Sequence, residues 1–384
     1  MKTNKLGIFS FFTGAGFLDL GFEKTGVFDV LLVNEIHQPF LDIYKHSHSK
    51  LGITPPLYGH SLSDVTSFLE KGKLDKLSQQ VQSSRNTYQY VGFIGGPPCP
   101  DFSVGGKNKG EKGENGKLSG TYINLICKVK PDFFLFENVK GLYRTEKHRT
   151  FFETLKKRLI KNGYYLTEKL INAIEYGAPQ DRERIILVGL KKSSFPNKKK
   201  AAVRSYLTDF PWGSHTNDNA ETIFAKDWPT TTPYREETDL ARPGNIIPEL
   251  TVEYWFNQND VVNHINSERY FTPQQGLIKF REISEGDDKK KSYKRLHRWR
   301  YSPTAAYGNN EVHLHPYKSR RLSVSEALAI QSLPKEYEIP NSITLSDSFK
   351  AVGNGVPFLA AKGLALTIYD YIKNGDQDAK TDSD

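Results

Sequence analysis

The first half of this sequence alternates apolar, β-prone segments with segments of helix length. The β-prone segments are residues 6–12, 27–35, 90–96, 131–139 and 184–190. Helix-length segments, such as 121–129 and 151–163, lie between them. Strands that alternate with helices pair in parallel, because each helix carries the chain back across one face of the sheet. The pattern therefore predicts an α/β fold with a mostly parallel sheet.

Several residues capable of chemistry stand where these predicted strands end. They are Gly14, Gly16, Glu35, Cys99 and Glu137. In open α/β sheets, ligands bind in the crevice beyond the carboxyl ends of the strands. We therefore expect these residues to share one edge of the sheet and to form a site there.

The sequence changes character near residue 191. From there to about 318 it is rich in Pro, Thr, Asn, Tyr and basic residues. Helical patterning resumes at Ser323, which forms a capping-box spacing with Glu326. The sequence thus divides into a first domain (1–190), a second, loop-rich domain (191–340), a C-terminal segment that returns to the first domain (341–375) and a disordered tail (376–384).

Positive charge is concentrated in two short runs. The formal net charge is +9 over 384 residues, whereas residues 191–200 and 279–300 each carry +5. Basic patches of this kind indicate a polyanionic partner, with phosphate contacts that make binding depend on salt. A solvated lysine-rich face is the alternative for either run alone.

The composition excludes two classes of protein. No run approaches the roughly 20 apolar residues that a membrane span requires. Gly14, Gly16 and Asp19 interrupt the apolar N-terminal stretch, which fits a strand and its turn better than a signal peptide. The two cysteines, Cys99 and Cys127, are too few for a secreted disulfide scaffold, so we expect a cytoplasmic protein without membrane association.

The turn at 13–16, Thr-Gly-Ala-Gly, follows the first predicted strand, and Glu35 ends the second. Small residues let a nucleotide-type cofactor approach the backbone, and an acid at the next strand end can bind ribose hydroxyls. Asp19 occupies the third glycine position of the G-x-G-x-x-G fingerprint, so a purely structural turn is equally compatible. Asp64 is a third candidate, with a helix cap as its alternative role.

Cys99 lies among prolines in the stretch Gly-Gly-Pro-Pro-Cys-Pro-Asp-Phe (95–102). A cysteine attacks as the thiolate, and a position between a strand and a helix can lower its pKa. The prolines restrict the backbone and hold the sulfur in one place. A stiff turn with an idle thiol is the alternative. Residues 101–120 are rich in Gly, Lys and Asn, a composition typical of a mobile lid.

Three further residues complete the candidate site. Glu137 closes the fourth predicted strand and is expected beside the cysteine loop. Arg182 and Arg184 alternate into a later strand, so we expect both to point to one face. Cys127, by contrast, stands among apolar residues of a helical stretch and is predicted to belong to the core.

In this order, the motifs resemble those of the DNA (cytosine-5)-methyltransferases of prokaryotic restriction–modification systems. The resemblance spans residues 8 to about 360 and rests on Phe12-Thr13-Gly14-Ala15-Gly16, Glu35, Pro97-Pro98-Cys99-Pro100, Glu137-Asn138-Val139, Gln180-Asp181-Arg182-Glu183-Arg184 and Gly353-Asn354-Gly355-Val356-Pro357. It implies a Rossmann-like, S-adenosylmethionine-dependent methyltransferase sheet in residues 1–190. It also implies a smaller, loop-rich DNA-recognition domain in residues 191–340.

The resemblance implies a reaction as well. Cys99 adds to C6 of cytosine and makes C5 nucleophilic, while Glu137 hydrogen-bonds N3 and the exocyclic amine. Arg182 or Arg184 steadies the ring carbonyl or the nearby backbone. Because the base cannot be reached inside a duplex, it is expected to flip out, and the 101–120 loop to close over it.

The same resemblance implies a pocket for S-adenosylmethionine. Phe12 stacks near the adenine, Glu35 binds the ribose and Asp64 contacts the adenine amine. The remaining pocket residues are Gly14, Gly16, Pro98 and Asn354. No metal site is expected, because no cysteine cluster matches the histidines of the second domain, which are interpreted as polar recognition residues: His264, His313 and His315.

Three positions depart from the family pattern. Ser10 stands where an aspartate is usual, Phe17 where a third glycine is common, and Pro100 where a glutamine follows the cysteine. These departures leave the cofactor contacts and the hinge of the loop open, but not the reaction class.

The implied partner is double-stranded DNA, and a monomer suffices for the reaction. Candidates for base-edge contacts are Trp299, Tyr301, Tyr307 and Asn309. A cognate restriction endonuclease acting on the same site is expected from the habit of the family. Alternatives are an RNA cytosine-5 methyltransferase, a non-catalytic DNA-binding protein, and an adenine-N6 or cytosine-N4 enzyme, against which the Pro-Pro-Cys loop argues.

Overall fold

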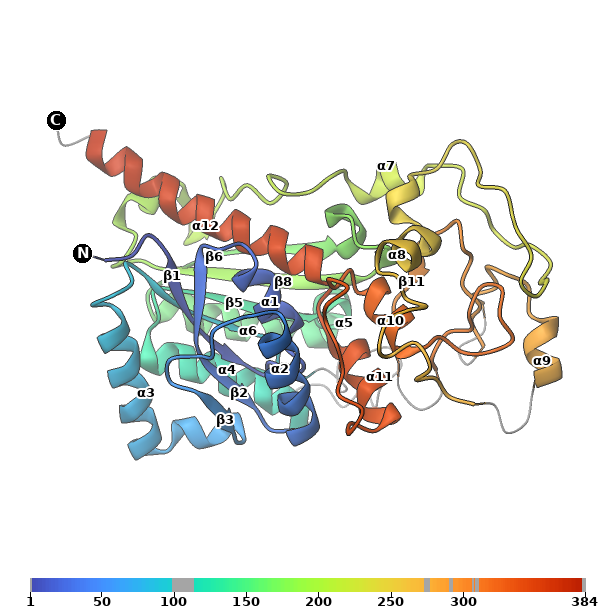
Figure 1. The fold of residues 1–384 in the computed structure, drawn as a ribbon. Coiled ribbons are helices and arrows are strands. Elements are labelled where there is room, and N and C mark those ends of the chain that lie inside the picture. Colours follow the sequence, from blue (N-terminus) through green and yellow to red (C-terminus); the bar gives the residue numbers. More distant parts are fainter. Residues whose placement is uncertain are drawn as a thin grey trace.

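The computed structural model describes residues 2–98, 114–272, 277–289, 293–305, 307 and 311–381. A large lobe is built on a nine-stranded sheet, and a smaller lobe of short helices and loops lies at one end of it (Figure 1). The sheet order is β3-β2-β1-β4-β5-β8-β6-β10-β9. Its first five strands are β3 (His60–Leu62), β2 (Phe28–Glu35), β1 (Leu6–Phe11), β4 (Val91–Gly95) and β5 (Phe133–Val139).

These five strands are mutually parallel, which confirms the predicted α/β fold. Strand β8 (Glu183–Lys191) is antiparallel to β5 and to β6 (Tyr164–Asn172). Strand β6 was missing from the predicted strands. Every residue of β1 and β4 is buried, because helices cover both faces of the sheet.

Two hydrophobic clusters lie on the two faces of the sheet. On one face, the core includes residues of α1 (Phe17–Glu23), α2 (Gln38–Lys50) and α12 (Phe358–Thr381). On the other face, it includes residues of α3 (Lys71–Ser84), α4 (Glu114–Val129) and α6 (Glu146–Lys161). Cys127 of α4 is half-buried and packs against this second core, which agrees with its predicted role.

The sheet continues beyond the predicted domain boundary at residue 190. Strands β9 (Ala202–Val203) and β10 (Tyr206–Leu207) add to its edge, where β10 pairs with β6. Trp212 then donates from Nε1 to Thr167 Oγ1 of β6 at 3.1 Å. The large lobe therefore extends past residue 207, because this segment completes a sheet edge.

The small lobe contains α7 (Ala220–Phe224), α8 (Val252–Gln258), α9 (Leu277–Glu282), α10 (Val324–Ile330) and α11 (Leu345–Asn354). The predicted capping box is present, because the Ser323 and Glu326 side chains bond each other's backbone N–H groups. Residues of α8, α10 and α11 share a third core with Phe17 and Leu20 of α1. The two lobes are thus joined by apolar packing.

Helix α12 extends to Thr381, where the sequence predicted a disordered tail from residue 376. No proline follows Gly375, and a single glycine costs a helix only about 1 kcal/mol, so the helix continues. The stretch Leu345–Asn374 is long and apolar enough to cross a membrane, but 61% of its most apolar window is buried inside the structure. That burial is typical of a core helix.

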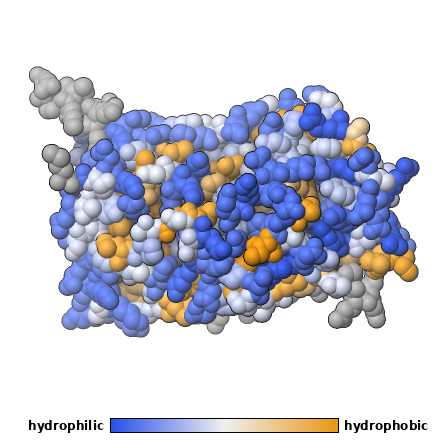
Figure 2. Space-filling view, viewed as in Figure 1, coloured by the Kyte–Doolittle hydropathy of each residue, from blue (hydrophilic) through white to orange (hydrophobic). Residues whose placement is uncertain are grey.

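The face in Figure 2 is mainly hydrophilic, with apolar side chains in small separate groups.

Candidate active site

The predicted site residues within the described chain gather at the carboxyl ends of the parallel strands. The turn at 12–16 follows β1, Glu35 ends β2, Pro97 and Pro98 follow β4, and Glu137 lies near the end of β5. Because these strands are neighbours in the sheet, the expectation of a shared edge is confirmed for these residues. Cys99, Pro100 and most of the predicted lid (101–113) lie outside the described residues.

Glu137 lies against the loop that leads to Cys99. Its side chain is buried, and a Cβ placed on Gly96 would come within 2.6 Å of its Oε2. The neighbouring Asn138 donates from Nδ2 to Pro97 O at 3.3 Å. A side chain at position 96 would therefore displace the Glu137 carboxyl group, and the Asn138 bond holds the loop against the end of β5.

Arg184 contacts Glu137 directly, with Nε 2.9 Å from Oε1. Arg184 reaches this edge because β8 is antiparallel to β5, so the start of β8 meets the end of β5. In that register Arg184 pairs with Val139, and Glu137 is a diagonal neighbour. The strand at 184–190 was predicted from the sequence, but its antiparallel direction was not.

Burial raises the pKa of the Glu137 carboxyl above its ordinary value. The guanidinium groups of Arg184 and Arg182 oppose this effect, because they favour the charged form. The net direction is upward, so Glu137 keeps its proton to higher pH than an exposed glutamate does. A carboxyl group in that state can act as an acid.

Arg182 plays a different part from Arg184. It is buried, and its guanidinium donates to Gly353 O at 2.8 Å and to Ala305 O at 3.0 Å. These carbonyls belong to the Gly-Asn-Gly motif and to the small lobe. The sequence predicted substrate contact for either arginine. In the structure Arg184 contacts Glu137, whereas Arg182 links the start of β8 to Gly353 and Ala305.

The glycine turn is shaped by left-handed backbone conformations. Phe12, Gly14 and Gly16 have φ of 55°, 56° and 83°. A Cβ on Gly16 would lie 2.5 Å from the Tyr44 ring, whereas a Cβ on Gly14 would meet nothing within 4 Å. Glu35 ties the turn down, because its Oε2 accepts from Gly14 N at 2.8 Å. The turn therefore presents open backbone beside a carboxylate.

Two of the sequence departures have partners in the structure. Ser10 donates from Oγ to Asp19 Oδ1 at 2.7 Å, so the serine holds the acid of the next helix. Phe17 is buried against Gly355, where a Cβ would lie 2.1 Å from the Phe17 ring. The large side chain at position 17 is thus accommodated by a glycine from the late motif.

Asp64 and Asn354 are exposed at the ends of other elements. Asp64 caps η1 (Val65–Leu69), where its Oδ1 accepts from Thr66 N at 2.7 Å, so the alternative role as a cap is present. Asn354 is the last residue of α11. Their predicted contacts with a cofactor stay predictions, as does that of Pro98.

Sequence reasoning missed two residues of this edge. Ile36, next to Glu35, is a large apolar residue that leaves 63% of its surface exposed. Tyr337 donates from its hydroxyl to Ala15 O at 2.6 Å and so holds the glycine turn from the C-terminal part of the chain. An isoleucine directly after the acid was a readable signal, whereas the long-range Tyr337 contact was not.

Comparison with known proteins agrees with this geometry. The family model for C-5 cytosine-specific DNA methylases matches residues 6–370. The chain belongs to this family. It is 58% identical over 383 residues to the Type II methyltransferase M.NmeDI of Neisseria meningitidis serogroup C, covering 99% of this chain and 87% of the relative. It is 28% identical to M.FnuDI of Fusobacterium nucleatum, covering 94% and 95%.

Solved structures share the fold of this methylase. A prophage-encoded E. coli protein assigned as a DNA modification methyltransferase aligns with a TM-score of 0.64 at 21% identity, covering 95% of this chain and 99% of that one. The S. pombe Dnmt2 methyltransferase aligns with a TM-score of 0.56 at 13% identity, covering 95% and 98%. These likenesses support the Rossmann-like methyltransferase sheet.

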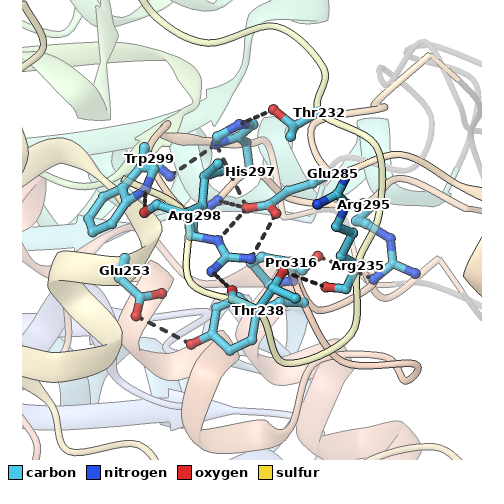
Figure 3. A network of polar contacts seen from close by, with 12 residues as sticks. Thr232, Arg235, Thr238, Glu253, Glu285, Arg295, His297, Arg298, Trp299 and Pro316 are labelled. Atoms are coloured by element: carbon cyan, nitrogen blue, oxygen red, sulfur yellow. Dashed lines mark hydrogen bonds and ion pairs between the residues drawn. The ribbon is translucent and has the colours of Figure 1, made fainter. Parts of the chain in front are cut away.

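The second basic run of the methylase, 279–300, is partly internal. Arg298 is buried and makes a bidentate pair with Glu285, at 2.9 Å from Nε to Oε1 and 3.0 Å from the terminal nitrogen to Oε2 (Figure 3). Arg295 is buried and donates to several backbone carbonyls, among them Ile283 O at 2.8 Å. These two arginines stabilise the small lobe, so the expectation that the run as a whole contacts phosphate is corrected for them.

Aromatic candidates for base recognition are also partly internal. Tyr307 is buried beneath Gly353, and Tyr301 packs against Phe224 and Trp228. Trp299 is accessible and lines a shallow cavity of about 360 Å³ together with residues that include Arg242 and Tyr254. Asn309 lies outside the described residues.

Two histidines expected to be polar recognition residues belong to the interior. Burial lowers the pKa of His313 and that of His315 to about 3, so both rings are neutral at ordinary pH. His264 is half-buried near the C-terminal segment, with Nε2 3.2 Å from Tyr337 O. Residues 312–315 are all buried, whereas the alternation of histidine with apolar residues predicts one exposed face, so the local pattern did not indicate this burial.

The first basic run, 191–200, does not lie at the active edge. Strand β8 begins at the active edge, where Arg184 is its second residue, and runs away from that edge. Leu190 therefore pairs with Phe133 at the beginning of β5. Lys191 is therefore about 24 Å from Arg184 along an extended strand. The prediction that this run contacts DNA phosphate stays a prediction, and the antiparallel strand places the run at the opposite end of the sheet from Glu137.

Proposed function

We propose that this methylase transfers a methyl group from S-adenosylmethionine to C5 of cytosine within one short sequence of double-stranded DNA. The observation that supports this most directly is the buried Glu137–Arg184 pair beside the loop that continues into Cys99. A protonatable acid and a fixed guanidinium suit a pyrimidine ring that gains negative charge during reaction.

The glycine turn and its surroundings fit the proposed cofactor. The open space at Gly14 admits a ligand to the backbone, and the Glu35 carboxylate is suited to ribose hydroxyls. Phe12 and Ile36 offer apolar surface for the adenine ring. The other proposed contacts are Gly16, Asp64, Pro98 and Asn354. When bound, S-adenosylmethionine supplies an electrophilic methyl group.

The proposed chemistry begins with the Cys99 thiolate. Its sulfur forms a bond to C6, and the displaced electron pair is stabilised as Glu137 donates its proton toward N3. The ring then behaves as an enamine, and C5 takes the methyl group. Loss of the C5 proton to a base expels the thiolate from C6, and return of the N3 proton to Glu137 restores the neutral aromatic ring.

Arg184 has two tasks in this scheme. It keeps Glu137 oriented, and we assign its guanidinium to the ring carbonyl. Arg182 supports the site by joining the start of β8 to two carbonyls of the small lobe, Gly353 O and Ala305 O. We further propose that the target base flips out of the duplex and that the 101–120 loop closes over it.

The biological setting is proposed to be a restriction system in the cytoplasm, where a cognate endonuclease cleaves the same sequence when it is unmodified. The enzyme is proposed to act as a monomer, with the small lobe reading DNA. The Type II methyltransferase names of its relatives support this role.

Bisulfite sequencing of plasmid DNA from cells that express the chain tests the proposal, with Cys99→Ala as the comparison. We expect protected cytosines in one recurring short sequence for the wild type and none for the variant. Purified Cys99→Ala should still bind S-adenosylmethionine in calorimetry, because the sulfur is not assigned to the cofactor pocket. Protection by the variant would refute the covalent mechanism. Methyl transfer to purified tRNA in place of duplex DNA would refute the substrate.

A further inference from the structure

The far edge of the sheet carries a concentrated positive surface. We define the rear basic face by Lys130, Lys191, Lys192, Lys199, Lys200 and Arg204. Residues 191–208 contain six basic residues and no acid. In Figure 1 this edge lies at the end of the molecule that carries the chain termini, and the small lobe lies at the other end.

Backbone and side-chain contacts bring these cations together. Lys191 N donates to Asp132 O at 2.8 Å, two residues after Lys130. Lys192 Nζ donates to Ser205 Oγ at 2.7 Å, which ties the turn containing Arg204 to the end of β8. The pKa of Lys191 is lowered, first by burial and also by the nearby charges of Arg85 and Lys130, against the opposing effect of Asp132.

Two acids near these cations accept hydrogen bonds from the packed part of the large lobe. Asp132 is buried and accepts from Arg85 Nε at 3.1 Å, Val91 N at 3.0 Å and Ser194 Oγ at 2.7 Å. Asp209, the first acid after the run, accepts from the Tyr371 hydroxyl at 2.5 Å. Lys199, Lys200 and Arg204 have exposed side chains.

The supporting elements are firmly packed. Lys199 ends η4 (Pro196–Lys199), which contacts α12, and Lys198 Nζ stacks 3.6 Å from the centre of the Tyr371 ring. Phe195, just before η4, is buried in the main core. Because these cations are held close together on a packed scaffold, they repel one another, and this repulsion lowers the stability of the fold. A bound polyanion would relieve the repulsion.

We propose that the rear basic face is a second, non-specific contact surface for duplex DNA. It lies at the opposite end of β8 from Arg184, because Arg184 pairs with Val139 at the end of β5 whereas Leu190 pairs with Phe133 at its beginning. The sheet therefore separates this face from a duplex held at the active edge. The rear basic face therefore holds a second segment of the same long DNA, or a second molecule. Such a contact keeps the enzyme near its substrate between target sites and raises the effective concentration of further sites.

The test uses the full chain with Lys199→Glu, Lys200→Glu and Arg204→Glu combined. The matched control combines Lys71→Glu, Lys73→Glu and Lys76→Glu, three exposed lysines of α3 with the same change in net charge. Binding is measured on plasmid-length DNA and on a duplex just long enough to fill the active site. Melting temperatures are measured for both variants, and values equal to that of the wild type establish that each variant is folded.

We expect the rear-face variant to lose at least about tenfold in affinity for plasmid-length DNA and to show a salt slope shallower by about 2 to 3. Its binding to the short duplex should match that of the control. Wild-type protein should also bring two differently labelled duplexes together at low salt, and the variant should not. Equal losses on short and long DNA would overturn the proposal, because the run would then touch the reacting segment. Unchanged binding to both DNAs would also overturn the proposal and would show that the rear basic face is merely solvated. Neither result depends on methyl transfer.

Discussion

Ser10 Oγ lies 2.7 Å from Asp19 Oδ1 beneath the glycine turn, and both side chains are buried. Burial raises the pKa of Asp19 from 3.8 to about 7, although the serine bond and His48 favour the charged form. The other groups that face this carboxyl are Glu23 and Tyr44. The Asp19 carboxyl group is thus buried under the proposed cofactor site and is largely protonated below neutral pH.

Asp19→Asn should change the pH dependence of stability. The folded state holds one proton more than the unfolded state between pH 3.8 and about 7, so the free energy of unfolding falls as pH rises through this window. The total loss is about 4 kcal/mol, at roughly 1.4 kcal/mol per pH unit. The asparagine variant mimics the protonated acid and should therefore lose less stability than wild type between pH 5 and 8. Melting temperatures across that range provide the measurement, and identical profiles would contradict the assignment.

Glu137→Gln should slow methyl transfer by about 10² to 10⁴, because the amide fills the same space but cannot supply a proton. Single-turnover transfer of a labelled methyl group to duplex DNA provides the measurement. Arg184→Lys, which keeps the charge, serves as the comparison and should lose less. A Glu137→Gln rate equal to that of wild type would remove Glu137 from the reaction.

Arg298→Met should destabilise the protein by about 3–5 kcal/mol, because it leaves the buried Glu285 carboxylate without its bidentate partner. Urea denaturation measures the loss. Lys289→Met, at an exposed position of the same basic run, should leave stability nearly unchanged. If Arg298→Met instead weakened DNA binding at unchanged stability, the internal role of Arg298 would be wrong.

Gly355→Ala should cost about 1–3 kcal/mol, since the new methyl group would overlap the Phe17 ring. The double variant with Phe17→Ala should be less destabilised than the sum of the two single variants, because the smaller side chain leaves room. A double-mutant cycle in urea gives the coupling energy. Strict additivity would show that the two positions do not compensate each other.

Much of the active edge could be predicted because its residues are local to strand ends. A strand followed by Gly-Ala-Gly, a strand ending in Glu35, and a strand ending at Glu137 must place those residues together once the strands pair in parallel. The capping box at Ser323 and the half-buried Cys127 follow from equally local patterns. The family motifs supplied the expected roles.

The sequence by itself determined the α/β class, the order of the motifs and the residues at the ends of the parallel strands, because each depends on short apolar runs and on neighbours along the chain. Tertiary structure decided the direction of β8, which brings Arg184 to Glu137 and carries Lys191 to the far edge. It also decided which basic residues are internal, such as Arg182 and Arg298. Strand direction and the partner of a buried charge depend on contacts between residues far apart in sequence, and no local pattern records them.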